Sequence, residues 1–119
     1  MSITDQNRET IITENNTAQN RLIDILENYS RESSHLTIQE QLHGDVDFSP
    51  LREMGFGLVD TITIGKGEIT KIVNIPKGIV SFTCIENLIK NIDNLPSSLT
   101  HINVSGNLLE NIVVSGLNN

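Results

Sequence analysis

Residues 95–112 read LPSSLTHINVSGNLLENI, and the spacing of apolar residues in this stretch recurs twice upstream. Apolar anchors stand twenty residues apart, at Val59, Ile79 and Leu99. Further apolar side chains follow each anchor at offsets of three, five, ten and thirteen residues: Ile62, Phe82, Ile102; Ile64, Cys84, Val104; Ile69, Ile89, Leu109; and Ile72, Ile92, Ile112. A fixed period of this length is typical of a solenoid, in which each repeat forms one coil.

Each unit predicts one short strand followed by a turn. The apolar residues at offsets three and five alternate with polar ones, as a strand with one buried face requires. Asn87 and Asn107, at offset eight, lie where the chain leaves the strand, and a buried amide there can bond backbone groups in neighbouring coils. Gly67 makes the same turn in the first unit without such bonds. Twenty residues leave no room for a full helix on the return path, and Pro76 and Pro96 favour extended backbone.

The stretch from Leu95 to Ile112 resembles the short, bacterial-type leucine-rich repeat, with the pattern L-P-x-x-L-x-x-L-x-V-x-x-N-x-L-x-x-L. Similar repeats occur in effector proteins that bacteria inject into host cells, and in proteins of amoebae and giant viruses. The third unit departs from the pattern, because Ser115-Gly116 replaces the aliphatic-Pro pair of the other units. The resemblance implies an α+β fold: a short leucine-rich-repeat solenoid with three parallel strands, an extended convex side and an N-terminal helical cap.

The first half of the chain predicts helices. Apolar side chains at helical spacing indicate a helix from about Thr17 to Arg31: Leu22, Ile25, Leu26 and Tyr29. Asn16, with Gln19 three residues later, forms an imperfect capping box for this helix. Thr37 and Glu40 have the same spacing and predict a short helix that ends at Gly44. A third helix is expected to begin at Ser49-Pro50 and to stop at Gly55.

These expectations divide the chain into three parts. Residues 1–15 are polar enough to form a disordered tail. Residues 16–57 are expected to form the helical cap that a solenoid needs over its first coil. Residues 58–119 hold the repeats, with units that begin at Val59, Ile79 and Leu99.

Composition excludes several classes of partner. The formal net charge is −7 and the pI is near 4.7. Nucleic-acid binding needs clustered Lys and Arg, which the sequence lacks, and attraction to anionic membranes is disfavoured for the same reason. The first residues show no signal-peptide pattern, and no apolar run is long enough to span a bilayer. A single cysteine, Cys84, excludes an internal disulfide and favours a reducing compartment, which would be the cytoplasm, or the host cytosol or a virion for an effector or a viral protein.

The sequence indicates no catalytic, metal or cofactor site. His35, His43 and His101 do not stand at metal-ligand spacing from one another or from Cys84. Cys84 takes an inward position of its strand, where a free cysteine packs as a small hydrophobe. We therefore expect a protein that is not an enzyme and that uses no cofactor.

The strand face of the repeats is the candidate binding surface. Its outward positions form a strip of mostly polar side chains, for which we expect protein as the partner: Thr61, Thr63, Ser81, Thr83, His101 and Asn103, flanked by Asp60, Val80 and Thr100. The favoured function is a protein-interaction or scaffolding module. Two alternatives stay open: a structural component such as a minor capsid protein of a giant virus, and the targeting domain of a bacterial effector.

The C-terminal coil lacks a covering element in the sequence. The chain ends in Ser-Gly-Leu-Asn-Asn, without an amphipathic helix or a charged strand. We expect either that the chain is the N-terminal part of a longer repeat protein, or that self-association or a partner covers this coil.

Overall fold

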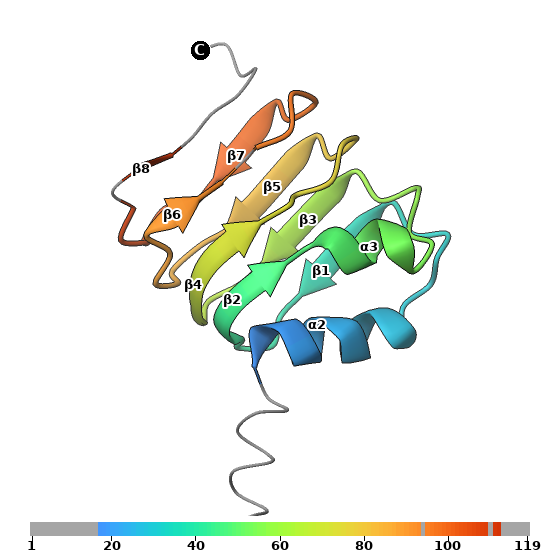
Figure 1. Ribbon diagram of the computed structural model, residues 1–119, viewed down its shortest axis with the longest axis horizontal. Coiled ribbons are helices and arrows are strands. Elements are labelled where there is room, and N and C mark those ends of the chain that lie inside the picture. Colours follow the sequence, from blue (N-terminus) through green and yellow to red (C-terminus); the bar gives the residue numbers. More distant parts are fainter. Residues whose placement is uncertain (1–16, 94, 110, 113–119) are drawn as a thin grey trace, which may run out of the picture.

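The computed structural model describes residues 17–93, 95–109 and 111–112 of the chain. Helices α2 (Ala18–Glu27) and α3 (Ser49–Glu53) accompany eight strands: β1 (His35–Ile38), β2 (His43–Asp47), β3 (Thr61–Ile64), β4 (Glu68–Val73), β5 (Ser81–Cys84), β6 (Asn91–Ile92), β7 (His101–Asn103) and β8 (Asn111–Ile112). The strands form two parallel four-stranded sheets, β1-β3-β5-β7 and β2-β4-β6-β8 (Figure 1). Consecutive strands alternate between the sheets, so the chain is a small β-solenoid, and we call each pair from β1–β2 to β7–β8 one coil.

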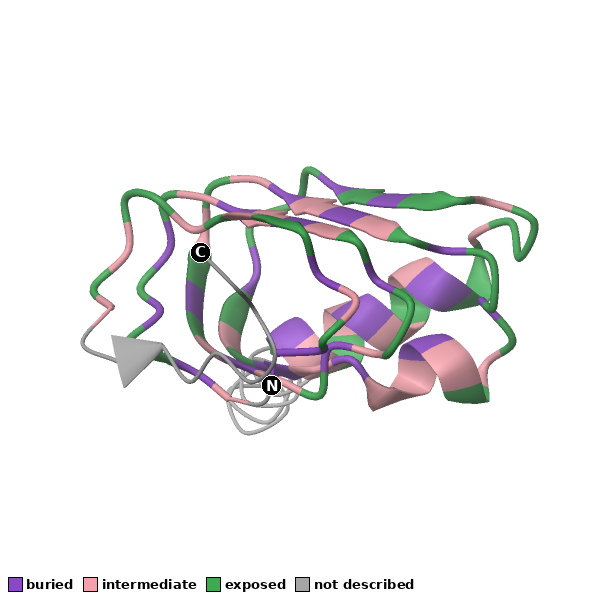
Figure 2. Ribbon diagram, turned by 90° about the horizontal axis from the view of Figure 1, so that it is seen from above, coloured by how far each residue is buried: buried purple, intermediate pink, exposed green. Residues whose placement is uncertain are grey.

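The strands at offsets two to five of each unit form the first sheet in the predicted register. Ile62 lies opposite Phe82, and Phe82 lies opposite Ile102. In β3 and β5 the even positions are buried and the odd ones are only half-buried. Buried and more exposed positions alternate along the strands in the same way in Figure 2. The predicted inward and outward positions are therefore confirmed in β3 and β5.

The return path of each coil is extended, as the twenty-residue length required. Strand β4 pairs with β2 and with β6, and β6 pairs with β8. Ile69, Ile72, Ile89 and Ile92, at offsets ten and thirteen, are fully buried and face the same core as the first sheet. The return path is more regular than expected, because it forms a sheet of its own.

The prediction of a helix from Thr37 to Gly44 is wrong. The first sheet also has four strands, where we expected three. Residues 35–38 form β1 in register with β3, and residues 43–47 form β2. Leu36 and Ile38 alternate with polar residues and are 0% and 2% exposed. Burial against β3 therefore outweighs the local helix-start signal, and the first coil lies inside the segment expected to be a helical cap.

The two other helices exist, with different ends from those predicted. Helix α2 stops at Glu27, and its N-cap is Thr17, whose Oγ1 accepts a hydrogen bond from the backbone N–H of Asn20. Asn16 lies outside the described residues. Helix α3 has Phe48 as its N-cap residue, where Ser49 was expected. Its five residues lengthen the first coil, because β1 and β3 start 26 residues apart (61 − 35) and later strands of this sheet start 20 apart (81 − 61).

Helix α2 lies against the first coil (Figure 1) and supplies hydrogen bonds to both of its strands. Ala18, Leu22 and Leu26 are fully buried under the helix. After the helix, the Tyr29 hydroxyl donates to the carbonyl of His35 at 3.1 Å and accepts from the N–H of Thr37 at 3.0 Å. The Gln19 side-chain amide makes the same pair of bonds with the backbone of Asp47 in β2, at 3.0 and 2.6 Å.

The asparagines at offset eight join neighbouring coils, as predicted. Asn87 accepts a hydrogen bond from the N–H of Ile69 at 3.0 Å and donates to the carbonyls of Gly65 at 3.1 Å and Ile85 at 2.8 Å. Asn107 repeats the arrangement one coil later: it accepts from the N–H of Ile89 at 3.0 Å and donates to the Cys84 carbonyl at 2.9 Å. Asn87 is 3% exposed, so few waters can replace these bonds.

Gly67 stands at offset eight of the second coil because the neighbouring asparagine needs its space. A Cβ at Gly67 would lie 2.9 Å from Oδ1 of Asn87 and 3.0 Å from the backbone nitrogen of Leu42. A side chain there would therefore require Asn87 or the backbone of Leu42 to shift.

The last described coil is less buried than we predicted. Ile102 and Val104 were expected to be almost fully buried, yet both are only half-buried. Their equivalents in the preceding coil, Phe82 and Cys84, are 0% exposed. The difference arises because Phe82 and Cys84 have a coil on each side.

We predict that Asn87→Ala lowers the free energy of unfolding by about 1–3 kcal/mol, because the buried N–H of Ile69 and two carbonyls lose their partner. Asn87→Asp, which is nearly isosteric, should cost at least as much at neutral pH, since a carboxylate would face the two carbonyls. Asn91→Ala, at an exposed position of β6, is the control and should cost under about 0.5 kcal/mol. Urea unfolding measures all three, and equal values would contradict the structural role of Asn87.

Candidate functional site

The outward side chains of the β1-β3-β5-β7 sheet form the candidate site, which we call the outer face. The register places them in two rows across the strands: His35, Thr61, Ser81, His101; and Thr37, Thr63, Thr83, Asn103. All six residues predicted from the sequence for the binding face are among them. The structure therefore brings the predicted residues together on one surface.

The outer face presents small neutral polar groups at regular spacing. Neighbouring strands of a sheet lie about 4.8 Å apart, and side chains on one face of a strand recur about every 6.6–6.8 Å. The residues of β3 and β5 on this face are half-buried by their neighbours, whereas those of β1 and β7 are exposed. Hydroxyl groups can both donate and accept hydrogen bonds, so the face suits a partner with mixed polar groups.

Histidines stand at both ends of one row, each held through Nδ1 by the hydroxyl of the preceding residue. Ser34 Oγ lies 2.9 Å from Nδ1 of His35, and Thr100 Oγ1 lies 2.8 Å from Nδ1 of His101. The Thr100 hydroxyl also donates to the Val80 carbonyl at 3.2 Å. A hydroxyl can donate and accept at once, so Thr100 joins the imidazole of His101 to the backbone at Val80.

The outer face is hollowed beside β7. An open cavity of about 390 Å³ is lined by Thr83, Thr100, His101, Ile102 and Asn103. Three of these residues belong to the predicted binding set. The hollow is lined by residues with hydroxyl, imidazole and amide groups together with Ile102, and none of its lining residues is Lys, Arg, Asp or Glu.

Two residues of the outer face, His35 and Thr37, were missed in the sequence. They belong to the first coil, which is 26 residues from the second (61 − 35) and so falls outside the twenty-residue period. The signal that would have found them is the polar–apolar alternation of His35-Leu-Thr-Ile38. Thr61-Ile-Thr-Ile64 has the same alternation.

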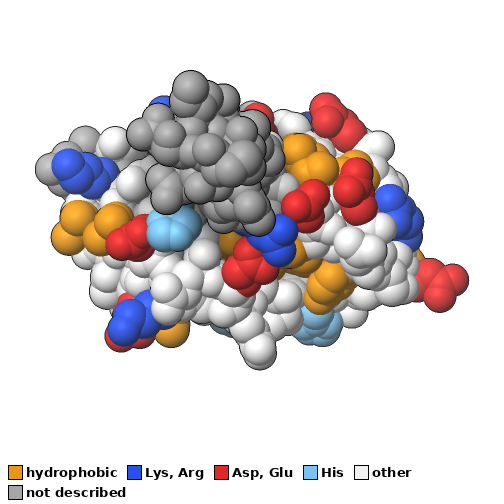
Figure 3. Space-filling view, turned by 90° about the horizontal axis from the view of Figure 1, so that it is seen from below, with side chains coloured by type: hydrophobic (Ala, Val, Ile, Leu, Met, Phe, Trp, Pro, Cys, Tyr) orange, Lys and Arg blue, Asp and Glu red, His pale blue; other side chains and the backbone are white. Residues whose placement is uncertain are grey.

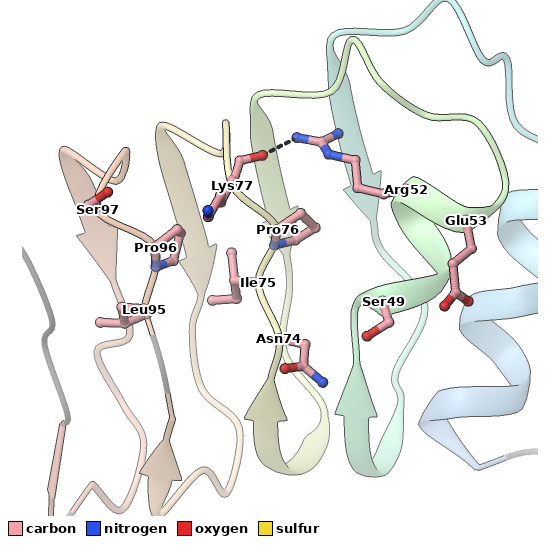
Figure 4. A pocket seen from close by; sticks show the side chains of 10 residues that line it. All are labelled: Ser49, Arg52, Glu53, Asn74, Ile75, Pro76, Lys77, Leu95, Pro96 and Ser97. Carbon is pink, nitrogen blue, oxygen red and sulfur yellow. Dashed lines mark hydrogen bonds between the residues drawn. The ribbon is translucent and has the colours of Figure 1, made fainter.

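A second cavity lies where α3 stands beside the proline turns of the next two coils. Its volume is about 660 Å³, and Figure 4 shows the floor, made by the Ile75-Pro76 and Leu95-Pro96 pairs of successive coils. Ser49 and Glu53 come from α3. The sequence predicted the repeated aliphatic-Pro pairs but not the cavity, because the cavity depends on α3 standing out from the stack.

Arg52, on the wall of this second cavity, is engaged in holding the backbone. Its Nη2 donates to the carbonyl of Lys77 at 2.7 Å, the dashed line in Figure 4, and to that of Val59 at 3.2 Å. Gly78 leaves room for this arginine, since a Cβ there would lie 3.0 Å from Nη2 and its φ is +95°. The guanidinium therefore ties α3 to the second coil and is not free to bind an anion.

Charged groups elsewhere are mixed in sign. On the side of the molecule shown in Figure 3, acidic and basic side chains lie interspersed among uncharged ones. The described part of the chain contains no group of three or more His, Cys, Asp or Glu residues placed to hold a metal ion. None of its helices combines the length and the apolar character that crossing a membrane requires.

Cys84 is buried, as predicted, beneath the outer face. Its side chain is 0% exposed, and the side-chain amide of Asn87 donates to its Sγ at 3.4 Å. Burial raises the pKa of the thiol to about 12, because the charged thiolate loses its hydration. The thiol is therefore a packing group of the third coil.

Comparison with protein-family models, with curated proteins and with solved structures finds no significant match to this chain. The geometry of the outer face is therefore the basis on which a function is proposed.

We predict that Cys84 of the folded protein reacts with a thiol reagent such as DTNB far more slowly than in denaturant at pH 8. The thiolate is the reactive form, and burial together with a pKa near 12 leaves almost none of it accessible. In guanidinium chloride, the single thiol should react at once. Equal rates in the two conditions would show that the third coil opens readily.

Proposed function

We propose that this chain is a protein-interaction module of the short leucine-rich-repeat type, in which the outer face binds the partner. The observation that carries the proposal is the alignment of the six predicted polar residues in two rows on one sheet. The hollow of about 390 Å³ at the β7 end of the same face supports it, because a protrusion of the partner can enter there.

In this proposal, helix α2 serves as the cap of the solenoid. Its apolar residues cover the first coil, and Tyr29 and Gln19 bond the backbone of β1 and β2. The cap keeps the polar rows in register at one end and so gives the partner a rigid surface. A rigid surface loses little conformational entropy on binding.

A structural role in a larger assembly is the second candidate. The outer face lacks Trp, Tyr and Arg, the residues that supply most of the binding energy at protein interfaces. A face of small side chains suits many weak, repeated contacts better than one tight complex. Purification of the native protein in a particle of fixed stoichiometry would favour this role.

We predict that Thr83→Lys abolishes partner binding and that Asn91→Lys preserves it. Both variants add the same charge to the third coil, one on the outer face and the other on the opposite sheet. Immobilised wild-type chain should retain one or a few proteins from a lysate of the source organism. The Thr83→Lys chain should retain at least tenfold less of them. Equal retention by the two variants would remove the outer face as the binding surface.

A further inference from the structure

Strand β7 has an open edge in the part of the chain that the structure describes. It pairs with β5 on one side, and no described strand pairs with the other. The N–H of His101 donates to the Val80 carbonyl at 3.1 Å, toward β5. Because successive residues of a strand direct their backbone groups to opposite edges, the N–H and carbonyl of Ile102 face the open side. These groups can bond another strand.

Apolar side chains accompany this open edge. Ile102, Val104 and Leu109 are only half-buried, and Leu108 is 52% exposed. The equivalents of the first three in the preceding coil, Phe82, Cys84 and Ile89, are 0% exposed. A layer packed against the last coil would bury the same positions again.

Strand β7 and its flanking residues carry no charge. Residues 99–109 contain no Lys, Arg, Asp or Glu, whereas the equivalent residues 79–89 contain Glu86 and residues 59–69 contain Asp60, Lys66 and Glu68. Natural proteins usually protect an open strand edge with charged side chains, lysine above all. The net charge of −7 is therefore carried elsewhere, so two copies of this chain can meet at β7 without like charges opposing them.

The opposite end of the solenoid cannot accept a β7 edge. The Tyr29 hydroxyl occupies the outer backbone groups of β1, and the Gln19 amide occupies those of Asp47 in β2. Thr17 adds a parallel bridge to His43. A head-to-tail stack of copies would have to displace these bonds, whereas a contact between two β7 edges displaces none of them.

We propose that the last coil is the interface of a homodimer, in which β7 pairs antiparallel with β7 of a second copy about a two-fold axis. In this arrangement the same strand can supply both partners, because the N–H of one copy faces the carbonyl of the other. With the axis perpendicular to the sheet, the two outer faces continue into one another across eight strands (4 + 4). The dimer does not depend on the proposed function of the outer face.

Sedimentation equilibrium of the 119-residue chain tests the dimer directly. The expected mass rises with concentration from 13.2 kDa towards 26.4 kDa (2 × 13.2). Amide hydrogen exchange supplies the second readout: the N–H of Ile102 should exchange more slowly as the concentration rises. A mass of 13.2 kDa throughout the micromolar range, with Ile102 exchange independent of concentration, would overturn the proposal.

A pair of matched variants locates the interface. His101→Lys with Asn103→Lys puts two like charges on each β7 edge and should give a monomer with fast exchange at Ile102. His35→Lys with Thr37→Lys changes the register-equivalent positions of β1, which are equally exposed, and should leave the dimer intact. Circular dichroism checks that both variants fold. A β7 variant that dimerises like the wild type would place the interface elsewhere and refute the proposal.

Discussion

The asparagine side-chain amide at the turn of the third and fourth coils is the interaction on which the stack depends. A solenoid this thin brings the backbone of its turns into the interior, where every N–H and carbonyl needs a partner. Strand pairing cannot supply all of them, because the chain changes direction there. Asn87 supplies both an acceptor and a donor to the preceding coil, at 3.0 Å from the N–H of Ile69 and 3.1 Å from the carbonyl of Gly65. The requirement extends to Gly67, which stays small so that this amide fits.

The first coil meets the same requirement with other residues. No coil precedes it among the residues that the structure describes, so its outward backbone groups would face solvent or an apolar helix. Tyr29 and Gln19 replace a strand there: the Tyr29 hydroxyl both donates and accepts, and Gln19 donates through its NH₂ and accepts through its carbonyl oxygen. Arg52 of α3 has a comparable role, since its guanidinium donates to the carbonyl of Val59 before β3 and to that of Lys77 after β4. Polar side chains thus supply the missing hydrogen-bond partners of the backbone where the periodic structure is interrupted.

The sequence predicted the parts of the fold that repeat and missed the parts that do not. Offsets three, five, ten and thirteen locate the buried positions of the second and third coils, because each coil imposes the same contacts on the next. The first coil was missed because the segment that holds α3 makes it six residues longer than the others (26 − 20), and because Thr37 and Glu40 resemble a helix start. Glu40 instead pairs with Arg21 of α2, a long-range contact that no local pattern encodes. The six outer-face residues were found for the same reason as the core: alternation along a strand fixes both faces at once.

The equal lengths of the later coils have a consequence for how such a chain can change in size. Removing residues 79–98 would bring Asn107 beside the coil that now receives Asn87, and Gly67 would offer it the same space. Inserting a further unit would lengthen the solenoid by about 4.8 Å, the distance between neighbouring strands. Units of this kind are interchangeable, because each carries its own bond to the one before it. Length is therefore a variable that gene duplication and deletion can adjust in steps, while the helical end stays unchanged.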